Sequence, residues 1–133
     1  MNLDWIVAEG RAPYKGSAGF QNLKVWQLAM DLVVAIYEAT AEFPASERFG
    51  LTSQIRRAAV SVPSNVAEGN GRTSRKEYAY HVSVASGSLR ELQSQIILAG
   101  RLGLLHNPDP LADQCETIGR MLTQLRKYLE TGN

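Results

Sequence analysis

The chain has 133 residues, of which 44% are hydrophobic and 20% are charged, and it carries a net charge of +1 at pH 7. This length supports one domain with a substantial core rather than two ordinary domains, and the charged fraction argues against wholesale disorder. No apolar run approaches the roughly eighteen residues of a membrane span, which argues against a membrane partner, and the single cysteine, Cys115, excludes an intrachain disulfide.

Residues 1–20 are predicted to form a flexible N-terminal tail, because glycines and a proline interrupt any helical period there. Four apolar residues of this tail give it the means to dock on the rest of the protein or on another subunit: Leu3, Trp5, Ile6 and Val7. The tail has acidic residues, Asp4 and Glu9, and lacks the basic start of a secretory signal. We therefore expect a cytoplasmic location, which also fits the lone cysteine.

The first helix is predicted over residues 22–42, where apolar residues recur at steps of three and four. One apolar row consists of Leu23, Trp26, Met30, Val33 and Tyr37, and the row beside it consists of Val25, Leu28, Leu32, Ile36, Ala39 and Phe43. Two rows make a face wider than a coiled-coil seam, as a bundle helix requires. Pro44 disfavours helical geometry at Phe43 and ends the helix. One further helical turn is predicted over residues 46–49.

The second long helix is predicted over residues 51–68, although Pro63 lies in its interior. Its apolar row consists of Leu51, Ile55, Ala58, Val62 and Val66. The proline ring removes one backbone hydrogen bond and clashes with the carbonyl group of Ala59, at a cost of about 3 kcal/mol. We therefore expect this helix to bend and to be held by its neighbours. Gly69 and Gly71 are predicted to adopt the left-handed geometry that ends a helix.

The third helix is predicted to begin at a capping box, because Ser74 and Glu77 have the S-x-x-E spacing. Its core row recurs at alternating steps of four and three: Tyr78, Val82, Ala85, Leu89, Leu92, Ile96, Ala99 and Gly103. This regularity implies near-parallel packing at a shallow crossing angle. Small residues from Ser83 to Ser88 form a waist that another helix can approach closely. Such packing would offset the cost of Gly87 in a helix, up to about 1 kcal/mol.

The fourth helix is predicted to begin at Asp109, a good N-cap, and Pro110, which suits the first helical position, and to end near Glu130. Its core row consists of Leu111, Cys115, Ile118, Leu122, Leu125 and Leu129. No strand pattern and no internal repeat is present in the sequence. Four amphipathic helices with short connections predict an all-α protein: an antiparallel up-down-up-down four-helix bundle over residues 21–131, with a Pro-bent second helix.

Three segments carry a resemblance to a known family: FQNLKVWQLAMDLV from Phe20, ERFGLTSQIRRAAVSVPSNVAEGNGRTSRKEY from Glu47, and GSLRELQSQI from Gly87. There the chain resembles the bacterial four-helix-bundle proteins encoded by intervening sequences of large-subunit ribosomal RNA genes, roughly from Phe20 to Leu105. The resemblance implies an up-down-up-down bundle, a ring of five subunits and no established enzyme activity. One related branch is similar to the accessory protein of diversity-generating retroelements, which works with a reverse transcriptase and binds nucleic acid through a basic surface. That branch is markedly basic, whereas the pI of this chain is about 7.9.

A row of polar residues follows one face of the second helix and belongs to the motif of the family that the chain resembles: Gln54, Arg57, Ser61, Asn65 and Glu68. In one interpretation the row faces a partner subunit or an interior seam, where neighbouring groups satisfy Arg57 and Glu68, since unpaired buried charge is costly. In the other interpretation the row binds an external ligand such as a phosphate. We favour the structural interpretation, because a single polar stripe does not make a catalytic site.

The turn before the third helix is the best candidate for an anion site. Three basic residues, Arg72, Arg75 and Lys76, lie there beside glycine-rich backbone and a helix N-terminus. Residues 56–90 contain six basic and two acidic residues, a net charge of +4. Five copies in a ring would repeat this charge and hold RNA or DNA by phosphate contacts, with steep salt dependence. The alternative is a capping turn with a solvated helix end.

The weakest functional alternative is a small helical ribonuclease. Arg75 and His81 have an R-x5-H spacing found in some such enzymes, and Arg101 and His106 have a similar spacing. In a ribonuclease, the histidine would act as general acid and base and the arginine would bind the phosphate. Neither histidine has a glutamate three residues before it, as a di-iron bundle requires, and Cys115 is predicted to be an inert buried thiol. We therefore predict no enzyme activity, no metal site and no cofactor.

The function predicted from the sequence is that of a non-enzymatic homo-oligomeric scaffold, which associates with nucleic acid or a nucleoprotein partner. The wide apolar face of the first helix and the small-residue waist of the third both favour self-assembly. A purely structural self-assembling protein is the main alternative, and in that case the basic turn would only cap a helix.

Overall fold

The computed structural model describes residues 19–131 and places four long helices there. They are α1 (Lys24–Thr40), α2 (Leu51–Asn70), α3 (Arg75–Arg101) and α4 (Asp109–Thr131), with short 3-10 turns η2 (Gly19–Asn22) and η3 (Ala45–Glu47). Residues 19–131 contain no β-strand, which confirms the prediction of an all-α fold with four helices. Most of the predicted tail lies outside the described residues, while its last two, Gly19 and Phe20, belong to η2.

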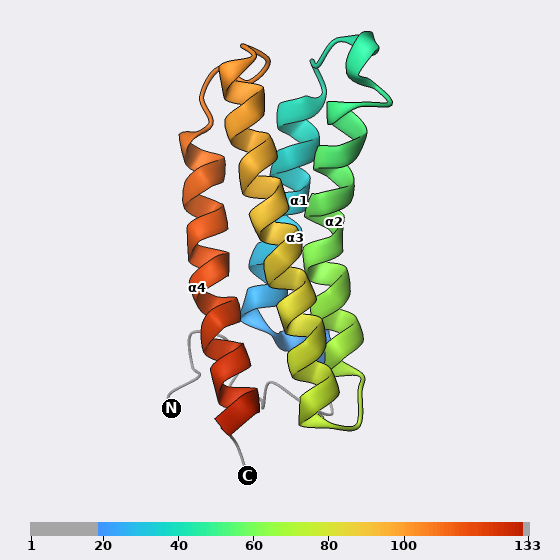
Figure 1. Cartoon of the computed structure of the whole chain (residues 1–133), viewed down its shortest axis with the longest axis vertical. Helices are drawn as coiled ribbons and strands as arrows, with labels where there is room; N and C mark the ends of the chain where they lie inside the picture. The colour runs from blue at the N-terminus through green and yellow to red at the C-terminus, as the bar shows by residue number, and fades with distance from the viewer. Residues whose placement is uncertain (1–18, 132–133) are drawn as a thin grey trace.

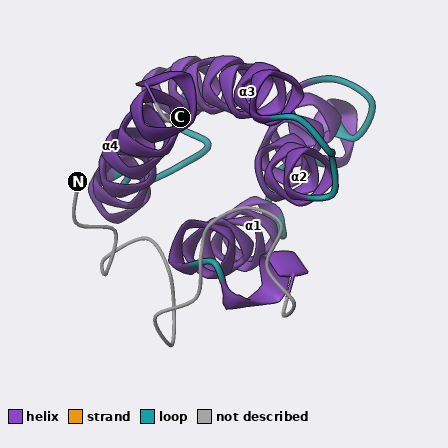
Figure 2. Cartoon of the chain, turned by 90° about the horizontal axis from the view of Figure 1, so that it is seen from below, coloured by secondary structure: helices purple, strands orange, loops and turns teal. Residues whose placement is uncertain are grey.

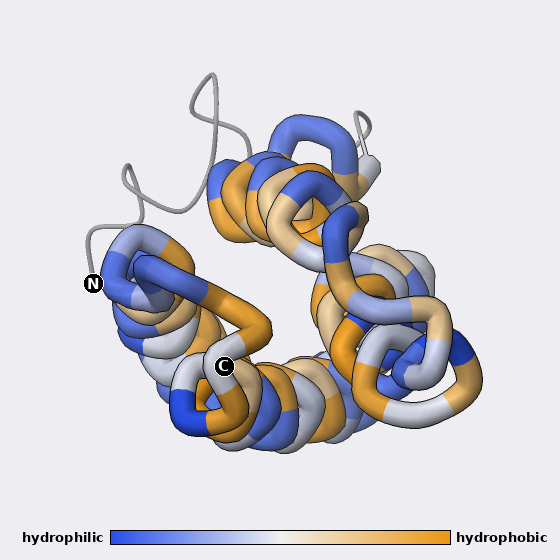
Figure 3. The backbone as a smooth tube through the Cα atoms, turned by 90° about the horizontal axis from the view of Figure 1, so that it is seen from above, coloured by the Kyte–Doolittle hydropathy of each residue, from blue (hydrophilic) through white to orange (hydrophobic). Residues whose placement is uncertain are grey.

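Successive helices run in opposite directions along one long axis, up, down, up and down (Figure 1). Seen end-on, the four axes surround a common interior (Figure 2), and each helix packs against the one before it and the one after it, with α4 returning to α1. Apolar and hydrophilic positions alternate along every helix (Figure 3). This alternation lets each helix bury one side while the opposite side faces water.

The predicted core rows of α2, α3 and α4 are buried, with one exception. Every residue of the rows on α2 and α4 is buried, and so is the α3 row from Tyr78 to Ala99. Gly103, the last residue of the predicted α3 row, is exposed and lies beyond the end of the helix. The helical period is enough to predict which residues of these three helices are buried, because each helix has a single apolar side.

Only part of the predicted face of α1 is buried. The residues of this segment that the core covers are Leu23, Val25, Ala29, Leu32, Ile36 and Thr40. The row that begins at Leu23 turns outward, so that Met30 and Tyr37 are about two-fifths exposed. Thr40, a polar residue absent from the predicted face, is buried because its hydroxyl group donates to the carbonyl oxygen of Ile36 at 2.8 Å and accepts from Nε of Arg56 at 2.8 Å.

The second helix continues through Pro63, which is itself buried. Nearby, the side-chain amide of Asn65 donates to the carbonyl oxygen of Ser61 at 2.9 Å, so this turn of the helix has a side-chain hydrogen bond in addition to its backbone bonds. Because the helix is continuous there, we infer that packing against the neighbouring helices offsets the energetic cost of the proline. The bend itself stays a prediction.

The prediction that Gly69 and Gly71 end α2 in the left-handed conformation is wrong. The helix runs past Gly69 to Asn70, and Gly71 has a right-handed φ of −82°. Gly69 is buried because α3 lies against it: a Cβ atom there would come within 2.8 Å of Cβ of His81 and 2.9 Å of Cδ1 of Tyr78. The glycine therefore permits close helix packing rather than a turn.

The ends of α3 follow local rules. At its start, Oγ of Ser74 accepts a hydrogen bond from the backbone N–H of Glu77 at 3.0 Å, which confirms the predicted cap. At its end, Gly103 has a φ of +75°, Leu104 N donates to Ala99 O at 3.0 Å, and Gly103 N donates to Gly100 O at 3.1 Å. This pair of bonds around a left-handed glycine is a Schellman motif, which terminates the helix.

Candidate functional site

The five residues of the polar row on α2 occupy two kinds of environment. Gln54 and Arg57 are exposed near the start of the helix, Ser61 and Asn65 are half-buried in its middle, and Glu68 is exposed near its end. The two ends of the row therefore lie at the surface, and its middle lies in the interface between α2 and α3.

A continuous chain of polar contacts joins α2 to α3. Oγ of Ser61 lies 2.8 Å from Oγ of Ser88, and the amide of Asn65 donates to Oγ of Ser61 at 3.1 Å. On its other side, Oδ1 of Asn65 lies 3.2 Å from Nδ1 of His81, whose Nε2 is 3.7 Å from a carboxylate oxygen of Glu68. Each half-buried side chain in this series of contacts, Ser61, Asn65, His81 and Ser88, has a hydrogen-bond partner, as buried polar groups require. The arrangement joins two helices through their polar side chains.

The basic side chains of the predicted anion turn differ in their surroundings. A terminal nitrogen of Arg72 donates to the carboxylate of Glu68 at 2.6 Å, one helical turn away, in an exposed ion pair. Lys76 is exposed in the first turn of α3. The carboxylate of Glu68 partly neutralises the positive charge of Arg72. Of the basic side chains in this turn, Lys76 is therefore the most accessible to a ligand.

Arg75 is directed at the C-terminal end of α4 instead of at solvent. Its Nη2 donates to the carbonyl oxygen of Tyr128 at 2.8 Å, its Nε donates to that of Leu129 at 3.3 Å, and its guanidinium carbon lies 4.6 Å above the centre of the Tyr128 ring. The last carbonyl groups of a helix carry partial negative charge, which a guanidinium group satisfies. Arg75 therefore has a structural role between α3 and α4.

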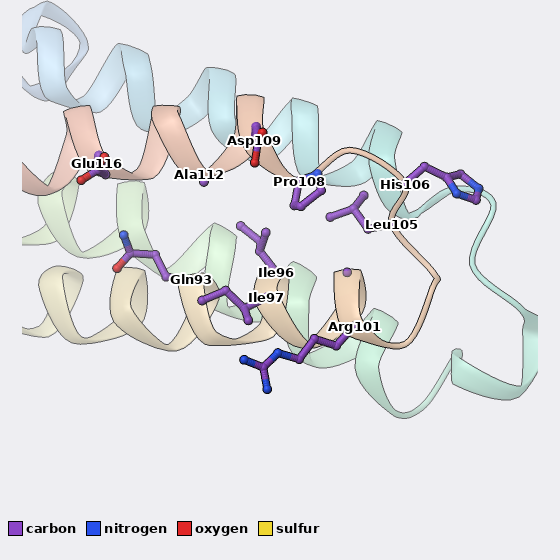
Figure 4. Close-up of a pocket in the computed structure, with 11 residues that line it drawn as sticks. Gln93, Ile96, Ile97, Arg101, Leu105, His106, Pro108, Asp109, Ala112 and Glu116 are labelled. Carbon is purple, nitrogen blue, oxygen red and sulfur yellow. The ribbon is translucent and has the colours of Figure 1, made fainter.

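The two Arg–His pairs of the ribonuclease alternative do not converge on a common point. Arg75 contacts α4, whereas His81 contacts α2. In the second pair, the side chain of Arg101 extends from α3 away from α4, and His106 points away from the side chains between the helices (Figure 4). Arg101 and His106 both line the cleft between α3 and α4, but their side chains are directed apart, whereas general acid–base catalysis on a bound phosphate requires that they converge.

A cleft of about 540 Å³ lies between the end of α3 and the start of α4. Ile96, Leu105 and Pro108 form its apolar part, and the carboxylates of Asp109 and Glu116 lie along its α4 side (Figure 4). Its polar groups do not point at one shared centre. The cleft therefore offers apolar contact without the converging polar groups that fix a substrate.

A second hollow, of about 640 Å³, lies along the first half of α2, and residues of α1 and of the connection before α2 complete it. Its lining includes three arginines and two aromatic residues, together with a threonine, and we call it the arginine hollow: Tyr37, Arg48, Phe49, Thr52, Arg56 and Arg57. Of the residues that line it, Arg57 and Ser61 belong to the predicted polar row. The signal in the sequence was the recurrence of arginine on both sides of the start of α2, but Tyr37 joins the hollow only through the packing of α1 on α2.

Two buried groups have raised pKa values because burial disfavours their charged forms. Desolvation raises the pKa of the Cys115 thiol to about 11, and it raises the pKa of the Tyr78 hydroxyl above its usual range although the side chain of Asn70 donates to that hydroxyl at 3.3 Å. Residues 19–131 contain no group of three or more His, Cys, Asp or Glu side chains arranged to hold a metal ion. None of the helices in this range combines the length and hydropathy that crossing a bilayer requires.

The chain matches the family model described as 23S rRNA-intervening sequence protein over residues 21–124. The match includes α1, α2 and α3 completely and most of α4, so it extends beyond Leu105, the approximate end of the resemblance seen in the sequence. No curated protein sequence matches the chain. Because the matched region spans most of the 133 residues and all four helices, the chain belongs to the 23S rRNA-intervening sequence protein family.

Proposed function

We propose that this protein is a non-enzymatic, self-assembling scaffold whose outer apolar faces are covered by further copies of the chain. The observation that carries this proposal is the exposure of large apolar side chains on two helices. Val34 of α1 is 57% exposed, Ile97 of α3 is 58% exposed, and Leu98 of α3 and Leu102, directly after the end of α3, are also exposed. Apolar side chains gathered on one surface are typical of protein–protein contacts, whereas isolated ones are ordinary.

The waist of α3 supports the same proposal. Gly87 lies in the helix interior and is exposed, and a Cβ atom added there would meet nothing within 4 Å among residues 19–131. Glycine in a helix costs up to about 1 kcal/mol relative to alanine, and the packing among these described residues does not offset that cost. A helix of another copy that approaches at Gly87 would offset it.

The family resemblance specifies the assembly further as a ring of five subunits. Its action in the cytoplasm is part of the proposal, because a lone buried thiol such as Cys115 suits a reducing compartment. The scaffold needs no catalytic group, which agrees with the polar chain between α2 and α3 serving to join helices.

The experiment is a mass measurement by size-exclusion chromatography with light scattering on three variants. Val34→Glu and Ile97→Glu each place a charge in a proposed apolar contact and are expected to reduce the assembly to smaller species. Thr123→Glu, which adds the same charge at an exposed position of α4, is the matched control and should keep the mass of the unmodified chain. Masses unchanged in both apolar variants would contradict the proposed contacts.

Association with RNA or DNA through the Arg72–Lys76 turn is the second candidate function. The exposed Lys76 favours it, and a ring would repeat that lysine in every copy. Binding of mixed RNA and DNA at two salt concentrations tests it, and the double variant Arg72→Glu with Lys76→Glu should abolish a salt-sensitive shift. No shift at low salt would leave self-assembly as the whole function.

A further inference from the structure

We propose that the arginine hollow binds single-stranded nucleic acid, with guanidinium groups on the phosphates and the ring of Phe49 against a base. This site is at the opposite end of α2 from the Arg72–Lys76 turn, and it does not depend on the proposed self-assembly. Its volume of about 640 Å³ is within the range of small-ligand sites, which suits a nucleotide unit of a longer strand.

The hollow is positively charged. Arg48, Arg56 and Arg57 line it, and none of the described residues that line it is acidic. The nearby carboxylate of Glu47 accepts a hydrogen bond from the backbone N–H of Leu51 at 3.1 Å, so it is engaged at the start of α2. Between described residues, no ion pair involves these three arginines, in contrast to Arg72 at the other end of the helix. Guanidinium groups without carboxylate partners are suited to phosphate, which they can bind with two hydrogen bonds.

Arg56 is held in place by contacts within the chain, and Arg48 lies near an aromatic ring. Arg56 donates through Nε to Oγ1 of Thr40 at 2.8 Å and through Nη2 to the carbonyl oxygen of Tyr37 at 3.4 Å, and its guanidinium carbon lies 4.4 Å from the centre of the Tyr37 ring. The guanidinium carbon of Arg48 lies 5.4 Å from the centre of the Phe49 ring. A side chain that is already ordered loses less conformational entropy when a ligand binds.

The aromatic part of the hollow is accessible. Phe49 is 88% exposed, so its ring does not contribute to the core of this chain and is open to stacking. Thr52, which also lines the hollow, has a buried hydroxyl oxygen without a hydrogen-bond partner within the described residues. Aromatic rings beside a basic groove form the usual combination in proteins that bind single strands without strong sequence preference.

A second copy of the chain presenting the same hollow is a poorer occupant than nucleic acid. Symmetric contact between two such hollows would bring six arginines together (three from each copy) without a carboxylate in either lining. Like charges brought together at an interface are unfavourable, whereas phosphates along a strand match the spacing of several cations. The test therefore treats contact between copies as the competing outcome.

The experiment measures fluorescence anisotropy of a labelled single strand of about 20 nucleotides, as RNA and as DNA, with the full chain at roughly 50 and 200 mM salt. The single strand should bind with an affinity that falls with salt, and the duplex of the same sequence should bind more weakly because its bases are stacked within it. Phe49→Ala should weaken binding at least about fivefold, from the loss of stacking. Arg57→Glu should weaken it further and reduce its salt dependence.

Two matched variants serve as controls. Lys127→Glu makes the same charge change as Arg57→Glu at an exposed position of α4, and Tyr80→Ala removes an exposed aromatic ring on α3 as Phe49→Ala does near α2. Both should bind the strand as the unmodified chain does. Binding lost in Lys76→Glu but kept in Arg57→Glu would assign nucleic acid to the turn and overturn the hollow. No binding at low salt, equal binding of duplex, or a changed assembly mass in Phe49→Ala with unchanged strand affinity would also overturn it.

Discussion

The guanidinium group of Arg75, at the start of α3, donates a hydrogen bond of 2.8 Å to the carbonyl oxygen of Tyr128, near the end of α4. The two residues are 53 positions apart in the chain, so this bond joins the first turn of one helix to the last turn of another. It places a permanent positive charge at the negative end of the α4 dipole.

Loss of this contact should destabilise the protein. Arg75→Ala is expected to lower the free energy of unfolding by about 1–2 kcal/mol, because it leaves helix-terminal carbonyl groups without a charged donor. Lys76→Ala, at the exposed neighbouring position, should change stability by less than about 0.5 kcal/mol. Urea unfolding at one fixed protein concentration measures both, and equal effects would show that the α4 contacts of Arg75 contribute nothing.

Gly69→Ala should also be destabilising, by about 1–3 kcal/mol, because the added methyl group overlaps Cβ of His81 at 2.8 Å and forces the two helices apart. Gly71→Ala is the control. It has an ordinary right-handed φ, and its added Cβ would lie 3.6 Å from the nearest atom, the carbonyl oxygen of Glu68. Thermal unfolding should separate the two variants clearly. A Gly69→Ala protein as stable as the original would mean that α2 and α3 are less tightly packed at this level.

The polar row can be divided by substitution. Asn65→Ala removes the amide that contacts Ser61 and His81, and it should cost about 1–2 kcal/mol of stability. Gln54→Ala changes an exposed residue of the same row and should be nearly neutral. Denaturant unfolding tests this difference. Equal, small effects would favour a role for the row in binding an external ligand.

Stability should decline in alkali. The pKa of Cys115 is raised from 9.0 to about 11 in the folded chain, so the folded state holds a proton that the unfolded state has lost between these values. The stabilisation from the neutral thiol is therefore complete below about pH 9 and is lost as the pH rises through about 11. The raised pKa of Tyr78 acts in the same direction. Unfolding measured at several pH values in Cys115→Ala should show a smaller decline than in the unmodified chain, and an identical decline would remove the thiol from this account.

Gly87→Ala tests whether the small-residue waist of α3 faces solvent or packs against another copy of the chain. The added methyl group has open space within the chain, so in a dissociated subunit it should stabilise the helix by up to about 1 kcal/mol. Where another copy packs against Gly87, the same methyl group should weaken the assembly. Light scattering over a range of concentrations should therefore show easier dissociation for Gly87→Ala than for Ser94→Ala, an exposed control on α3. Unchanged dissociation would mean that Gly87 faces solvent.

The sequence predicted the helices and most core positions because the helical period is a local property. The exception, α1, has apolar residues on two adjacent rows, so the choice between them depends on neighbouring helices. Thr40 is buried because Arg56 from α2 bonds to it, and no pattern within α1 indicates that partner. Gly69 was misinterpreted for a similar reason, since a glycine near a helix end can permit either a turn or a close approach.

The candidate site was only partly predictable from the sequence. The spacing of Ser61 and Asn65 places them on one side of α2, but the register of α3 decides that Ser88 and His81 lie opposite. The sequence likewise grouped Arg75 with Lys76 by proximity, whereas its partners come from α4. Contacts between residues far apart in the chain depend on how the helices pack, which local patterns do not specify.

The mass of the unmodified chain in solution tests the proposed scaffold most directly. Light scattering at micromolar concentration should give several times the mass of one 133-residue chain, and five times that mass if the ring implied by the family resemblance forms. A stable species with the mass of a single chain at this concentration would contradict self-assembly, and the exposed apolar faces of α1 and α3 would then require another partner.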